Sequence, residues 1–198
     1  MAVVLTTTAL QAHRLDECLQ AARIAVEEDR VEIELGLTPG VAVAATIIGD
    51  IDRDRDGVLS GEEQRAYVKD VVNALRLSVD GRSLAIEAGP SVFPELAAVR
   101  AGEAIINLQF VASLPAMSAG RHYISFTNAF RRDVSVYMTN ALVPEDDRIT
   151  ITAQQRDPEQ RTTTIAYAIA SRSSEMWPVW MGAPFAGAWL VFRRRFLR

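Results

Sequence analysis

Residues 75–86 read LRLSVDGRSLAI, which is the pattern of two short β-strands joined by a tight turn. Apolar side chains occupy alternate positions on both sides of the turn, namely Leu75, Leu77, Val79, Leu84 and Ile86. Because successive side chains of a strand point to opposite faces, this alternation predicts strands with one buried face. Asp80-Gly81 between the two runs is a strong signal for a two-residue hairpin.

Similar alternating runs extend outward from this hairpin over most of the chain. On its N-terminal side, the runs at 22–26 and 31–37 are separated by Glu28-Asp29, which suggests a tight turn. On its C-terminal side lie the runs 106–114, 122–127, 134–138, 149–153 and 163–169. About nine short strands at this spacing predict a mainly β protein with an immunoglobulin-like β-sandwich fold.

The stretch between residues 38 and 75 has helical spacing instead. Thr38-Pro39 predicts a helix start, because a capping hydroxyl is followed by a proline in the first turn. Apolar residues then recur at helical intervals in two groups, Ala44, Ile47, Ile48 and Ile51, followed by Tyr67, Val68, Val71, Val72 and Leu75. The sequence therefore predicts two helices, inserted between the second and third strands.

The segment between these helices is strongly acidic. Residues 50–63 contain six acids and two arginines, and six minus two gives a net charge of −4, equal to that of the entire 198-residue chain. Such local concentration indicates a cation site rather than a generally acidic surface. The remaining residues are neutral on balance, and no basic patch alternates with aromatic residues, so we expect no nucleic-acid partner.

Residues 52–63, DRDRDGVLSGEE, have the spacing of a metal-binding loop. Three aspartates fall at its first, third and fifth places, and Gly57 follows at the sixth, where the chain must turn sharply. The segment resembles the twelve-residue loop of an EF-hand, which implies Ca²⁺ as the cofactor. The predicted ligands are the side chains of Asp52, Asp54, Asp56 and Glu63, the carbonyl of Val58, and Ser60 through a bridging water.

The loop stands alone in the sequence. EF-hands usually come in pairs, but Glu145-Asp146-Asp147 has neither the spacing nor the glycine of a second loop. A lone loop predicts a structural clip rather than a sensor, with a dissociation constant of roughly 10⁻⁴–10⁻³ M, the range of extracellular modules. Magnesium is disfavoured, because it seldom uses a cage made only of protein ligands.

The two ends of the chain differ from the body. Residues 1–12 are apolar and small, which suggests the remnant of a signal peptide. Residues 176–192 are uncharged, contain all three tryptophans and precede three arginines, so we expect a membrane anchor and basic tail over 176–198, behind a linker at 171–175. Seventeen residues in a helix span about 26 Å, the short limit for a membrane. An interfacial segment or a last piece of core are the alternatives.

This arrangement places the main domain, residues 13–170, on the outer (periplasmic) side of a cell membrane. The DxDxDG stretch at 52–57, Glu63 and the strand 75–81 resemble the extracytoplasmic domains that precede the membrane part of HupE/UreJ-type nickel permeases. The resemblance implies an extracytoplasmic β-rich domain. Because the multi-span permease is absent, it implies an accessory role beside a membrane-protein partner. We therefore predict a membrane-anchored calcium-binding module with a structural or partner-binding role.

One alternative is an accessory protein that handles nickel or copper. Cleavage before His13 would expose an amine and an imidazole that could bind such a metal together with His122. However, His122 falls on the same predicted strand face as Ile124 and Phe126, where a lone histidine is usually a satisfied core or edge residue.

An enzyme is the less favoured class. The sequence contains no GxSxG, HExxH, P-loop or GxGxxG motif. The single cysteine, Cys18, excludes an internal disulfide framework and is predicted to be a buried apolar side chain. Scattered acids such as Glu95, Glu103 and Asp133 leave open a carboxylate-pair hydrolase, because their spacing alone carries no information.

Overall fold

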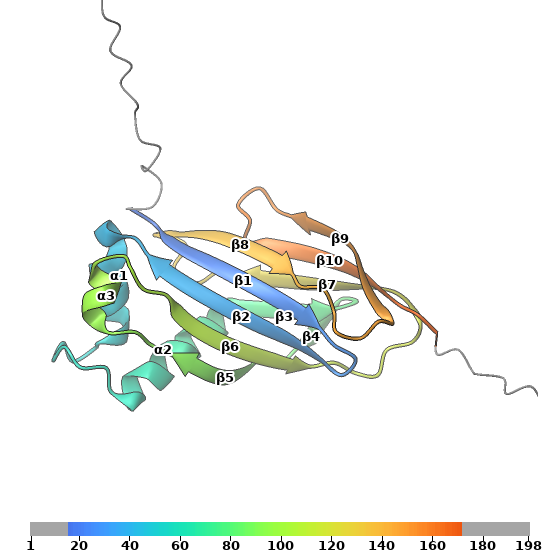
Figure 1. The fold of residues 1–198 in the computed structure, drawn as a ribbon, viewed down its shortest axis with the longest axis horizontal. Coiled ribbons are helices and arrows are strands. Elements are labelled where there is room, and N and C mark those ends of the chain that lie inside the picture. The colour runs from blue at the N-terminus through green and yellow to red at the C-terminus, as the bar shows by residue number, and fades with distance from the viewer. Residues whose placement is uncertain (1–15, 172–198) are drawn as a thin grey trace, which may run out of the picture.

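The computed structural model describes residues 16–171, which form two five-stranded β-sheets and three helices (Figure 1). In one sheet the strand order is β5-β6-β2-β1-β8, and in the other it is β4-β3-β7-β10-β9. The strands are β1 (Cys18–Val26), β2 (Arg30–Pro39), β3 (Leu75–Val79), β4 (Arg82–Leu84), β5 (Glu87–Val92), β6 (Ile106–Ser113), β7 (Gly120–Asn128), β8 (Ser135–Ala141), β9 (Ile149–Arg156) and β10 (Thr162–Ile169). The helices are α1 (Val41–Ile51), α2 (Gly61–Ala74) and α3 (Leu96–Arg100). The prediction of a mainly β, sandwich-like protein is confirmed, whereas the immunoglobulin-like assignment stays a prediction.

The predicted hairpins are present. β3 and β4 pair in antiparallel orientation, with Leu77 opposite Leu84. Asp80 and Gly81 both have positive φ, 47° and 79°, as the right-handed twist of a two-residue hairpin requires. β1 and β2 pair in the same way, with Val26 opposite Val31 across the turn.

One core lies between the sheets. Every second residue of β2 is buried, and its buried side chains join those of β1 and β6 from one sheet and of β3, β7 and β10 from the other. All strand pairs are antiparallel except β1 with β8, which run parallel. The alternation in the sequence thus specifies the face that each strand turns toward the core.

Three details differ from the sequence prediction. The first helix begins at Val41 with Gly40 as its N-cap, because Thr38 and Pro39 continue β2 and lie opposite Leu19 and Cys18 of β1. An additional strand, β5, pairs with β6, so the described residues contain ten strands. The short helix α3 was also not predicted.

The helices gather at one end of the sheets, as Figure 1 shows. α1 packs against α3 through a small apolar cluster of Ile48, Leu96 and Val99, while Tyr67 of α2 belongs to the main core. Within residues 16–171, none of the helices has the length and apolar character needed to cross a membrane. The predicted signal remnant (1–12) and anchor with its tail (176–198) lie outside the described residues.

Candidate metal centre

The acidic loop connects α1 to α2. Asp52 follows the last residue of α1, and its backbone N–H donates to the carbonyl of Ile48 at 2.8 Å, which ends the helix. Ser60 is the N-cap of α2: its Oγ accepts a hydrogen bond from the backbone N–H of Glu63. The two helix ends therefore fix both ends of the loop, and the metal-ligand pattern runs from the C-cap of α1 to the first turn of α2.

Three of the predicted ligands come together. One carboxylate oxygen from each of Asp52, Asp54 and Glu63 lies within 4.8 Å of the other two. Two like unit charges at that separation repel by about 1 to 3.5 kcal/mol, depending on the local dielectric. This group could hold a metal ion, whose positive charge would offset the repulsion.

Asp52 has the geometry expected of a metal ligand. Its side chain is buried, with 4% of the residue exposed. Oδ2 accepts a hydrogen bond from the backbone N–H of Gly57 at 3.1 Å, but Oδ1 is buried and has no hydrogen-bond partner. A buried carboxylate oxygen without a partner is costly, so this atom is a candidate ligand for a cation.

Glu63 is held in its ionised form. Oε2 accepts from the hydroxyl of Ser60 at 2.8 Å and from the Ser60 backbone N–H at 3.0 Å, and Oε1 accepts from the backbone N–H of Arg53 at 2.8 Å. The hydroxyl hydrogen bond, followed by the backbone ones, lowers the pKa of Glu63 below its ordinary value. The carboxylate is therefore negatively charged at neutral pH.

The turn of the loop depends on its backbone conformation. Gly57 has φ of +81°, in the left-handed region that favours glycine, and Arg55 also has a positive φ of 62°. Hydrogen bonds from Asp56 N–H to Asp54 Oδ1, at 3.1 Å, and from Val58 N–H to Asp56 Oδ1, at 2.7 Å, stabilise the turn. The guanidinium of Arg53 pairs with Asp70 of α2.

The other predicted ligands lie nearby but outside the three-carboxylate group. Asp56 is exposed and Val58 is 65% exposed, while Ser60 contributes the cap described above. Their roles as ligands stay predictions.

Sequence reasoning missed that Ser60 and Glu63 form a capping box, although the S-x-x-E spacing was a sufficient signal. Leu59 of the loop packs against both apolar clusters.

The structure places His122 and Cys18, the residues considered for other metal or thiol chemistry, in the core. His122 is buried, with Nδ1 2.8 Å from Asp80 Oδ2 and Nε2 2.8 Å from the carbonyl oxygen of Ser118, so both ring nitrogens are engaged. This confirms the expectation of a satisfied core histidine, while His13 lies outside the described residues. Burial raises the pKa of the Cys18 thiol to about 12, which keeps it protonated at neutral pH.

The acids considered for a hydrolase are dispersed and exposed. Glu95 is the N-cap of α3 and Glu103 follows that helix, whereas Asp133 lies between β7 and β8 and pairs with Arg131.

Comparison of the chain with protein-family models, with curated proteins and with solved structures found no match. The site must therefore be interpreted from its own chemistry.

Proposed function

We propose that residues 52–63 form an EF-hand-like site for Ca²⁺ and that the ion stabilises the connection between α1 and α2. The observation that carries the proposal is the buried, unpartnered Oδ1 of Asp52 beside the carboxylates of Asp54 and Glu63. A helix on each side and the turn at Gly57 support the same interpretation.

The donor atoms favour calcium over a transition metal. The clustered side chains offer only carboxylate oxygens, which suit Ca²⁺, whereas nickel and copper sites usually include imidazole or thiolate ligands. When bound, the ion would supply the positive charge that holds the loop in one conformation. The proposed role is therefore structural, in a module that serves a membrane-protein partner.

The deciding experiment compares two neighbouring glutamates by isothermal titration calorimetry of the full chain with Ca²⁺. Glu63→Gln removes the charge from the cluster but keeps a side chain that can complete the capping box. Glu62→Gln makes the same change one residue earlier, at an exposed position outside the cluster. We expect a dissociation constant of roughly 10⁻⁴–10⁻³ M for the parent and for Glu62→Gln, with loss of measurable binding in Glu63→Gln.

Two results would refute the calcium proposal. The first is absence of heat with Ca²⁺ in the parent protein. The second is equal affinity of the Glu63→Gln and Glu62→Gln variants, which would show that the carboxylate cluster is not the binding site.

Attachment to a membrane is a second part of the proposal, supported by the uncharged, tryptophan-containing segment at 176–192. The change Ala186→Asp places a charge near the middle of this segment and should release the full chain from membranes in a flotation assay. Ser173→Asp, in the preceding linker, is the matched control and should leave flotation unchanged. Equal behaviour of both variants would contradict the anchor.

A further inference from the structure

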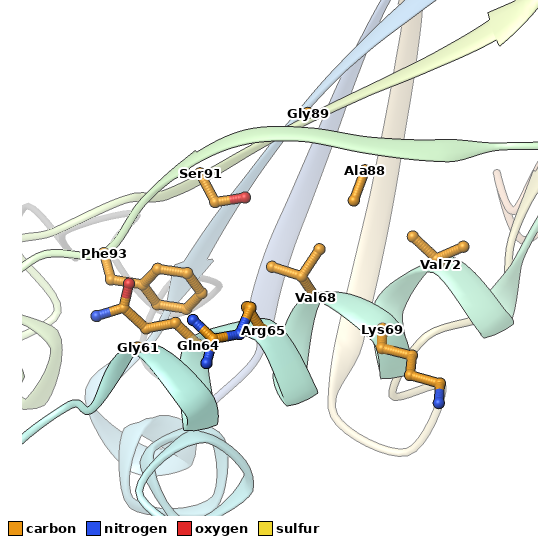
Figure 2. Close-up of a pocket in the computed structure, with 10 residues that line it drawn as sticks. All are labelled: Gly61, Gln64, Arg65, Val68, Lys69, Val72, Ala88, Gly89, Ser91 and Phe93. Carbon is orange, nitrogen blue, oxygen red and sulfur yellow. The ribbon is translucent and has the colours of Figure 1, made fainter.

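A groove runs between α2 and the edge strand β5, as Figure 2 shows, and has a volume of about 570 Å³. On the helix side it is lined by residues at helical spacing, Gly61, Gln64, Arg65, Val68, Lys69 and Val72. On the strand side it is lined by Ala88, Gly89 and Ser91, and by Phe93 just after the strand.

The groove exists because the inner face of β5 carries small side chains. Ala88 lies opposite Phe110 of β6, and Ser91 lies opposite Leu108. Directly opposed residues of an antiparallel pair share one face of the sheet, so Ala88 and Ser91 face inward with these two core residues. In Figure 2 both point from β5 toward α2. Ala88 is nevertheless exposed, so no side chain fills the space in front of it.

The lining combines an apolar interior with a cationic side. Val68, Val72 and Phe93 provide apolar surface, whereas Arg65 and Lys69 are exposed on α2. No acidic residue lines the groove. An occupant that complements these features has an apolar body and an anionic group.

The backbone of β5 argues against an extended peptide as the occupant of the groove. A peptide would bring a row of backbone N–H and C=O groups that need partners. β5 is poorly suited to supply them, because Pro90 has no N–H and the pairing of β5 with β6 shifts register between Ala88 and Ser91. A molecule with one charged end and no polar groups along its body avoids this cost.

We propose that the groove between α2 and β5 binds an apolar carboxylate, with its alkyl chain along Val68, Val72 and Phe93 and its carboxylate at Arg65. From Gln64 to Val72 the helix rises by about 12 Å, which suits a medium-chain acid. The proposal is independent of the metal site, because the groove is formed by α2 and β5 without the clustered carboxylates.

The test is a titration of the full chain with decanoate, followed by backbone amide NMR, in chelator and again with Ca²⁺. We expect shifts confined to the amides around Val68, Val72 and Ala88, in either condition. Decylamine, of the same chain length but opposite charge, should bind at least about tenfold more weakly, because Arg65 attracts an anion and repels a cation.

Three variants locate the ligand. Arg65→Glu should weaken decanoate binding about tenfold by reversing the charge at the groove. Ala88→Leu should block the groove by filling it, and because Ala88 is exposed this change should leave the dispersion of the spectrum intact. Arg82→Glu makes the same charge change as the first variant at an exposed position outside the lining, and should bind decanoate as the parent does.

Several outcomes would overturn the proposal. These are the absence of decanoate shifts in both conditions, shifts elsewhere in the protein, or unchanged affinity in both Arg65→Glu and Ala88→Leu. Tighter binding of a short apolar peptide than of decanoate to the same amides would assign the groove to a peptide partner instead.

Discussion

The side-chain amides of Gln20 and Asn128 join the two sheets through the core, with Asn128 Nδ2 donating to Gln20 Oε1 at 2.8 Å. Gln20 lies on β1 and Asn128 on β7, and they are only 1% and 2% exposed. Nε2 of Gln20 donates to the carbonyl of Phe130 at 2.9 Å and to Ser135 Oγ at 2.8 Å, while Asn128 Oδ1 accepts from the Phe130 N–H. These polar groups are satisfied, so the pair specifies how the sheets align without an unpaired buried atom.

Replacing Gln20 with leucine should therefore destabilise the protein by about 2–3 kcal/mol, because the amide of Asn128 loses its buried partner. Urea denaturation of the full chain measures the loss. Gln109→Leu, at an exposed position of β6, is the matched control and should change stability by less than about 0.5 kcal/mol. A double change of Gln20 and Asn128 to leucine should cost less than the sum of the two single changes. Strict additivity would contradict the coupling of the two amides.

The conformation of the acidic loop gives a second prediction. Gly57→Ala should cost about 1–2 kcal/mol and weaken Ca²⁺ binding, because φ of +81° is unfavourable for a residue with a Cβ atom even though no neighbour obstructs it. Gly49→Ala is the matched control: this glycine is exposed within α1 with open space around it, so alanine should stabilise the helix by about 0.5–1 kcal/mol. Chemical denaturation in chelator measures the stability of both variants, and calorimetry measures their affinity for Ca²⁺. A stabilising effect of Gly57→Ala would contradict the model of the turn.

Most of the fold follows from alternation in the sequence, and the exceptions have local causes. The hairpin at Asp80-Gly81 was predicted because its strands alternate cleanly and its turn residues accept positive φ. β5 was missed because Gly89-Pro90 interrupts the alternation at the point where its pairing shifts register. Thr38-Pro39 has the composition of a helix start, but pairing with β1 outweighs that local preference.

The two candidate sites were not equally accessible to sequence reasoning. Asp52, Asp54 and Glu63 lie within one loop, so their spacing was enough to predict that they meet. The groove combines the segments 61–72 and 88–93, whose contact depends on how α2 packs beside the sheet. Its defining feature is the absence of large side chains at Ala88 and Ser91, which has no signature in a linear sequence.

The unpartnered oxygen of Asp52 gives a prediction for the metal-free protein. Asp52→Asn keeps an oxygen for the N–H of Gly57 and replaces Oδ1 with an amide that can donate to the neighbouring carboxylates. In chelator it should stabilise the full chain by about 1–2 kcal/mol, because it removes repulsion and a buried unsatisfied atom. Asp56→Asn, an exposed position in the same loop, should change stability less.

Calcium should offset this difference in stability. At a concentration ten times its dissociation constant, Ca²⁺ should stabilise the parent by about 1.4 kcal/mol, which raises Tm by about 3–6 °C, and should leave Asp52→Asn unchanged. Thermal melts in chelator and in millimolar Ca²⁺ measure both effects. A parent protein with the same Tm in both conditions would contradict the account of the site.

The pair of His122 and Asp80 predicts how stability depends on pH. Burial alone would lower the pKa of His122, but the hydrogen bonds to the Asp80 carboxylate and the Ser118 carbonyl outweigh it and raise that pKa above its ordinary value. The His122 hydrogen bond, opposed by burial, lowers the pKa of Asp80, whose other oxygen accepts from the Tyr123 N–H. At intermediate pH the imidazolium and the carboxylate are therefore both charged, and they join the β3–β4 turn to β7.

The direction of the pH effect follows from these shifts. Stabilisation by His122 should be complete below its unfolded pKa of about 6.5 and should be lost as pH rises through the higher folded pKa, while the contribution of Asp80 should be lost as pH falls below its unfolded value of about 3.9. Thermal melts of the full chain between those limits and slightly alkaline pH should show falling stability above about pH 6.5. His122→Gln should remove that fall, whereas His13→Gln, at the only other histidine of the chain, should preserve it. Identical pH profiles for the parent and His122→Gln would show that the pair does not couple protonation to folding.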